Sequence, residues 1–110
     1  MEELAISKNP RVTGNLPELP TETPDYYANL KSIAFSANSL TGTFPSSYYK
    51  IPKLKYVDVR KNFLNGSIPE LVPNRTQPNK WEFLYLSGNR MTGTLPNSMS
   101  YMERLQELDI

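Results

Sequence analysis

The feature that most limits the fold of this chain is a phrase of 13 residues that recurs along it. It reads I-A-F-S-A-N-S-L-T-G-T-F-P at 33–45, V-D-V-R-K-N-F-L-N-G-S-I-P at 57–69 and L-Y-L-S-G-N-R-M-T-G-T-L-P at 84–96. An earlier copy at 4–17 has one extra residue. Because a unit of this size cannot bury an apolar face alone, repetition at this period predicts a solenoid of stacked units.

Two apolar columns open every copy and predict a short strand in each. The first column is Leu4, Ile33, Val57, Leu84 and Leu108. The second column, two residues later, is Ile6, Phe35, Val59, Leu86 and Ile110. Residues two apart lie on the same face of a strand, and β-branched and aromatic side chains favour strands over helices. We therefore expect one strand per unit, with both columns facing the core.

The second half of the phrase predicts a tight turn with its own recurring residues. Asparagine follows the strand at Asn9, Asn38, Asn62 and Asn89. An amide carries donors and an acceptor for backbone groups that turn out of a strand, so these residues predict a stacked ladder of hydrogen bonds. Glycine then recurs at Gly14, Gly42, Gly66 and Gly93, where a tight bend or a close neighbour excludes a side chain. The next apolar positions, expected in the core, are Leu16, Phe44, Ile68 and Leu95. A proline ends each copy, and after two of these prolines Ser46 and Asn97 are expected to cap short turns.

Together these columns resemble the leucine-rich repeat family in its plant-specific subtype, L-x-x-L-x-L-x-x-N-x-L-x-G-x-I-P. Similar repeats occur in plant receptor ectodomains, in polygalacturonase-inhibitor-like proteins, and in bacterial or trypanosomatid surface proteins. The resemblance implies a β-rich solenoid of the α/β type, with a curved parallel sheet on the concave side. It implies short 3₁₀ or irregular turns on the convex side, and few or no long helices. It also implies binding of a ligand or partner on the concave side, without catalysis.

We interpret residues 1–110 as one solenoid domain of about four to five repeat units, partial at both ends. Neither end shows a capping repeat with a polar outer face, so we expect the chain to be part of a longer array. The alternative is a short protein whose ends are capped by another chain. No cysteine is present to form the paired caps that are usual in secreted plant members. The net charge of +1 gives no reason to expect nucleic acid, and no apolar run is long enough to span a membrane.

The residue types that most often carry catalysis are missing or isolated. The chain contains no histidine and no cysteine, which excludes imidazole bases, thiolate nucleophiles and the usual zinc sites. Asp58 and Asp109 are expected in one row two strands apart, about 10 Å from strand spacing. Such a distance suits glycoside hydrolysis, but an open sheet offers no pocket around the pair. We therefore predict a protein that is not an enzyme and has no cofactor.

Strand alternation places three rows of side chains on the face opposite the core. The rows are Glu3, Ser32, Tyr56, Phe83 and Glu107; Ala5, Ala34, Asp58, Tyr85 and Asp109; and Ser7, Ser36, Arg60 and Ser87. Aromatic residues and arginine dominate binding hot spots, which predicts contact with a protein or peptide, or with a glycan. The residues of this predicted site are Tyr56, Asp58, Arg60, Phe83 and Tyr85. The alternative is that Asp58 and Arg60 pair across solvent while the rings shield the sheet. A nearby basic run is interpreted as a solvated face rather than a site for an acidic partner; it comprises Lys50, Lys53, Lys55, Arg60 and Lys61.

Two sequons are candidate glycosylation sites, Asn65-Gly-Ser67 and Asn74-Arg-Thr76. Asn74 is the better placed of the two, because it is expected to lie on an exposed loop. The leading hypothesis is a non-enzymatic recognition module at the cell surface or outside the cell, which binds through its concave face. Two alternatives stay open. One is a structural segment for adhesion or spacing; the other is an inhibitor of a secreted hydrolase, as the resemblance to some plant members implies.

Overall fold

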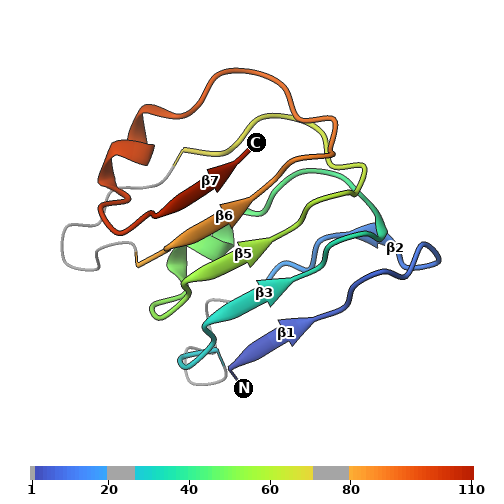
Figure 1. The fold of residues 1–110 in the computed structure, drawn as a ribbon, viewed down its shortest axis with the longest axis horizontal. Helices are drawn as coiled ribbons and strands as arrows, with labels where there is room; N and C mark the ends of the chain where they lie inside the picture. The colour runs from blue at the N-terminus through green and yellow to red at the C-terminus, as the bar shows by residue number, and fades with distance from the viewer. Residues whose placement is uncertain (1, 20–26, 71–79) are drawn as a thin grey trace.

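A five-stranded parallel sheet forms one side of the molecule. In the computed structural model, which describes residues 2–19, 27–70 and 80–110, its strands follow the order β1-β3-β5-β6-β7 (Figure 1). They span Glu3–Ala5, Ser32–Ala34, Tyr56–Asp58, Phe83–Tyr85 and Glu107–Asp109. Because the order in the sheet follows the order in the chain, each repeat unit adds one strand beside the previous one. The predicted solenoid is confirmed.

The register of this sheet follows the first apolar column. Partners across the sheet run from Leu4 to Ile33, Val57, Leu84 and Leu108. The three central residues of that column are buried, and their neighbours along each strand point to the opposite side. We call that opposite side the concave face. Its three rows of side chains therefore follow the same register.

Asparagine amides close the turns after β3, β5 and β6, and Asn62 shows the full set of contacts. Its Nδ2 donates to the carbonyl oxygens of Phe35 at 2.8 Å, Val59 at 3.1 Å and Arg60 at 3.2 Å. Its Oδ1 accepts from the backbone N–H of Leu40 at 3.2 Å. Asn62 is 4% exposed, so these bonds satisfy backbone groups that water cannot reach.

Neighbouring amides share their acceptors. The Phe35 carbonyl accepts from Asn38 at 2.9 Å as well as from Asn62. The Val59 carbonyl accepts from Asn89 at 2.9 Å as well as from Asn62. Each shared carbonyl therefore links two successive repeat units through their side chains.

The first unit, which carries the inserted residue, makes a different set of contacts. Asn9 is exposed, and its Oδ1 accepts from the N–H of Arg11, 3.2 Å away in its own turn. The backbone N–H of Asn9 donates to Asn38 Oδ1 at 3.2 Å. The Asn9 side chain thus serves a local, solvated turn, whereas the later amides bridge buried backbone.

A second, two-stranded parallel sheet lies beyond these turns, where the sequence predicted turns alone. It pairs β2 (Thr13–Asn15) with β4 (Ser39–Thr41). Glycine permits the close stacking here: Gly42 has a φ of +85°, and a Cβ on it would lie 2.6 Å from Asn15 Oδ1. An alanine at Gly42 would therefore meet backbone strain, and its Cβ would push the exposed Asn15 side chain aside.

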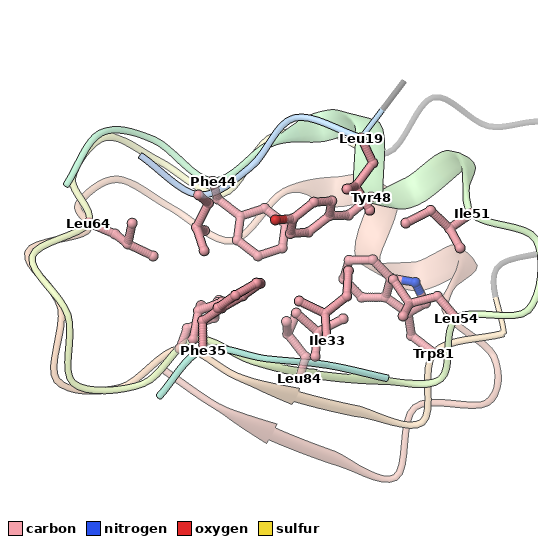
Figure 2. Close-up of a cluster of buried hydrophobic side chains, with 14 of the residues drawn as sticks. Leu19, Ile33, Phe35, Phe44, Tyr48, Ile51, Leu54, Leu64, Trp81 and Leu84 are labelled. Carbon is pink, nitrogen blue, oxygen red and sulfur yellow. The ribbon is translucent and has the colours of Figure 1, made fainter. Parts of the chain in front are cut away.

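The core fills the space between the five-stranded sheet and the turns that return on its other side. Two 3₁₀ helices, η1 (Ser46–Lys50) and η2 (Asn97–Tyr101), belong to these turns. Figure 2 shows Phe44 and Tyr48 reaching from the η1 side toward the strands. The ring centroid of Phe44 lies 5.5 Å from that of Tyr48 and 6.2 Å from that of Trp81. The expected short 3₁₀ turns are confirmed, and the described ranges contain no long helix.

Two expectations about the turns are wrong. Leu95 is 46% exposed rather than buried, because within the described residues no neighbouring turn packs over it. Ser46 and Asn97 do not cap η1 and η2. The N-cap residues are Pro45 and Pro96, without a side-chain hydrogen bond, because each helix already begins at the polar residue.

Candidate partner-binding site

The five residues predicted to contact a partner lie together on the concave face. β5 supplies Tyr56 and Asp58, and β6 supplies Phe83 and Tyr85. The register pairs Tyr56 with Phe83 and Asp58 with Tyr85. Arg60 comes two residues after Asp58, so strand alternation keeps it on the same face. Two adjacent strands therefore position the whole set.

Three aromatic rings, which we call the aromatic cluster, pack against one another on this face. The ring centroids are 6.1 Å apart for Tyr56 and Phe83, 5.6 Å for Tyr56 and Tyr85, and 6.3 Å for Phe83 and Tyr85. These separations fall in the range of favourable aromatic pairs. Each of the three residues is part-exposed. The rings thus hold one another in place while keeping surface open to solvent.

Arg60 is held against this cluster by Asp58. Its Nε donates to Asp58 Oδ1 at 2.9 Å and its Nη2 to Oδ2 at 2.8 Å. The guanidinium carbon lies 4.5 Å from the centre of the Tyr85 ring, which is a cation–π contact. The hydrogen bonds to Asp58 raise the pKa of Arg60 above its ordinary value, so the guanidinium stays charged. Its position is therefore fixed on two sides.

Asp58 itself is buried, at 4% exposure, although the sequence placed it among the contact residues. Its carboxylate also accepts from the Tyr56 hydroxyl at 3.3 Å. Burial alone would raise the pKa of Asp58, but the hydrogen bonds from Arg60 outweigh it and the net pKa is lowered. Burial, helped by the charge of Asp58, raises the pKa of Tyr56. Asp58 is thus placed to position two neighbours and has little surface for a partner.

Two carboxylates on β7 border the cluster, and the sequence reasoning left them out of the site. The Tyr85 hydroxyl donates to Glu107, and the Ser87 hydroxyl donates to Asp109 Oδ2 at 2.7 Å. The hydrogen bond to Glu107, together with burial, raises the pKa of Tyr85 to about 12. Both acids belong to the rows that hold Phe83 and Tyr85. Their position in those rows was the sequence signal that could have added both acids to the predicted site.

Apart from Glu3, the half of the concave face nearest the N-terminus carries small side chains. Across β1 and β3 the paired residues include Ala5 and Ala34, and Ser32 lies beside Tyr56. The side chains therefore change in size between β3 and β5. Tyr56 stands at this boundary, with the cluster on one side and the small residues on the other.

The basic run does not form one face. Lys55 Nζ lies 3.9 Å from a carboxylate oxygen of Glu82, and Lys53 donates to Asn29 Oδ1 at 2.9 Å. Arg60 lies on the concave face, beside the aromatic cluster. The charges that are close in sequence are thus distributed over different surfaces.

The remaining candidate sites are less defined. Asn65 is exposed, so its sequon stays a prediction, and Asn74 lies outside the described residues. Within the described ranges, no group of three or more histidine, cysteine or carboxylate side chains is placed to hold a metal ion. Among the helices of that same part of the chain, none is long and apolar enough to cross a membrane.

Comparison with known proteins gives relatives with the same repeats. The family profile described as Leucine Rich Repeat matches residues 80–102. Receptor-like protein 31 of Arabidopsis thaliana is 32% identical over 107 residues, which cover 97% of this chain and 12% of that protein. Pollen receptor-like kinase 2 of the same plant is 36% identical over 86 residues, which cover 78% of this chain and 12% of that protein. The chain therefore spans 12% of the length of each of these two relatives.

Solved structures support the same fold. A crystal structure of a BIR3–SERK2 complex from Arabidopsis thaliana matches with a TM-score of 0.70 at 25% identity, over 90% of this chain and 49% of that chain. The plant peptide hormone receptor RGFR1, solved in complex with RGF2, matches with a TM-score of 0.73 at 28% identity, over 89% of this chain and 15% of that chain. The repeat columns, the parallel sheet and these relatives agree. The chain is therefore built from leucine-rich repeats of the type found in plant receptor-like proteins.

Proposed function

We propose that the chain is a recognition module that binds a protein or peptide through its concave face, at the cell surface or outside the cell. The observation that carries the proposal is the aromatic cluster, which places three part-exposed rings and a fixed guanidinium on one open surface. Aromatic side chains and arginine supply most of the energy at binding hot spots.

The rigidity of the cluster supports binding. Tyr56 and Tyr85 are held by ring contacts and by hydroxyl hydrogen bonds to Asp58 and Glu107. Side chains that are already ordered lose little conformational entropy when a partner docks, so more of the contact energy appears as affinity. A segment that acts only as a spacer needs stacked repeats but no such surface.

The relatives are consistent with this proposal. One solved neighbour is described as a plant peptide hormone receptor in complex with RGF2, and another as the BIR3–SERK2 complex. Several relatives are described as receptor-like proteins. This similarity is the reason that the proposal includes an extracellular or surface location. Recognition rather than catalysis is proposed because the chain also lacks histidine and cysteine.

The test uses a displayed library of random 12-residue peptides, selected on the purified chain. Individual peptides are then titrated against the wild type, Phe83→Ala and Tyr85→Ala. We expect each alanine variant to weaken binding by about 10-fold or more, as at other hot spots.

The matched control is Phe63→Ala. Phe63 is 41% exposed and has Arg90 4.9 Å above its ring, but it lies after Asn62, outside the concave rows. Equal losses for Phe63→Ala and Phe83→Ala, or no loss for Phe83→Ala, would refute the proposed site.

A further inference from the structure

Charge is unevenly distributed between the concave face and the rest of the chain. The three rows hold four carboxylates and one guanidinium; these are Glu3, Asp58, Glu107, Asp109 and Arg60. The whole chain nevertheless carries a net charge of +1. The face that carries the aromatic cluster is therefore acidic, although the protein is slightly basic.

Among the described residues of the three rows, the one cation is Arg60, and it is already neutralised. Arg60 makes a two-point ion pair with the buried carboxylate of Asp58. What remains near the cluster is the pair of carboxylates on β7. Glu107 is exposed and Asp109 is part-exposed, and each receives a hydroxyl hydrogen bond, from Tyr85 and Ser87. A hydroxyl donor leaves the negative charge in place and keeps further oxygen lone pairs open.

We propose that the partner is a peptide or protein segment that presents a lysine or arginine beside an apolar side chain. The apolar group packs on Tyr56 and Phe83, and the basic group contacts Glu107 and Asp109. This inference rests on the proposed function, since it specifies the chemistry of the partner at the same surface. Complementary charge of this kind selects partners and speeds their association. The opposite outcome of the test is a partner whose carboxylate is recognised mainly by Arg60.

The test uses two fluorescein-labelled synthetic peptides that differ only in charge. One has three repeats of Ser-Leu-Ser-Lys and the other has three repeats of Ser-Leu-Ser-Glu, so that leucine and the charged residue lie on the same side of an extended chain. Fluorescence anisotropy gives the Kd of each at 50 mM and 500 mM salt. We expect the lysine peptide to bind about 10-fold more tightly at low salt, with the preference largely lost at high salt.

Isosteric variants assign the preference to β7. The double variant Glu107→Gln with Asp109→Asn should weaken the lysine peptide by about 5-fold or more and leave the glutamate peptide unchanged or tighter. The control is Glu103→Gln, an exposed carboxylate in the turn before β7. Circular dichroism confirms that each variant is folded.

The outcomes separate this inference from the proposed function. If Phe83→Ala weakens both peptides but their affinities are equal, the charge inference fails and the proposed site stands. The charge inference fails in the same way if the glutamate peptide binds more tightly, or if the β7 variant has no effect. If neither peptide binds with a Kd below 1 mM, the charge inference also fails. If both bind and Phe83→Ala changes neither, the proposed function fails.

Discussion

Replacing Asn62 by alanine tests how the buried amides hold successive units together. The change removes one acceptor and three donated hydrogen bonds at a residue that is 4% exposed. The backbone groups that lose a bond to Asn62 differ in whether another hydrogen-bond partner remains. The carbonyls of Phe35 and Val59 each keep another asparagine amide as a donor, and the Arg60 carbonyl keeps the N–H of Ala37 at 2.9 Å.

The main cost therefore comes from the N–H of Leu40, which loses Asn62 Oδ1. Leaving a buried donor unpaired costs about 1–3 kcal/mol. The lost packing of the amide adds about 1 kcal/mol. We expect Asn62→Ala to lower the free energy of unfolding by about 2–4 kcal/mol.

Urea unfolding gives this value, with the fluorescence of Trp81 as the signal, because it is the only tryptophan and is 1% exposed. The control is Asn9→Ala. Asn9 is exposed and serves a local turn, so its loss should cost less than about 1 kcal/mol. Equal costs for the two variants would refute the reasoning, since burial and bridging would then make no difference.

Three further predictions use the same unfolding assay. Gly42→Ala and Gly14→Ala should each cost about 1–2 kcal/mol, because both glycines have a left-handed φ; the new Cβ at Gly42 meets the exposed Asn15 side chain, which can turn aside, and the one at Gly14 has no atom within 4 Å. Ala37 has a φ of 57°, so Ala37→Gly should stabilise the fold by about 0.5–1 kcal/mol, and a loss of stability would contradict the strain argument. The pKa of Asp58 is lower in the folded state than in the unfolded state. The ionised carboxylate therefore adds to the free energy of unfolding above about pH 4, and this contribution is lost as the pH falls through the folded pKa. Asp58→Asn should therefore be less stable than wild type at pH 7 but lose less further stability between pH 5 and pH 2, and parallel pH curves would count against this role.

The strands and their register were predictable because they depend on a pattern that repeats. Leu4, Ile33, Val57, Leu84 and Leu108 occupy one column in the sequence and one line of partners in the sheet. Stacking repeats must align equivalent residues, so the recurring columns predict the register even though the spacing between copies varies.

The features that the sequence did not predict depend on contacts between units or on the ends of the stack. The repeat predicts a buried position for Leu95, but burial also needs a neighbouring turn to cover it. The left-handed residues Lys8, Ala37 and Lys61 each precede a turn asparagine, but only the fourth copy, with Gly88 at a φ of 73°, carries the residue type that favours this conformation. Likewise, Asp58 was assigned to the surface by alternation, but its 4% exposure accompanies hydrogen bonds from the long side chains of Arg60 and Tyr56, which alternation does not take into account.

The uniform register of the five strands also limits how many residues of a bound extended peptide can align with the side-chain rows of this face. Side chains along a row recur about every 4.8 Å, the distance between hydrogen-bonded strands. An extended peptide that crosses the strands presents same-side residues about every 6.8 Å, at about 3.4 Å per residue. The two periods are incommensurate, so a long peptide falls out of phase with the rows. Because the cluster and its bordering acids occupy only β5, β6 and β7, they match about two same-side residues of such a chain.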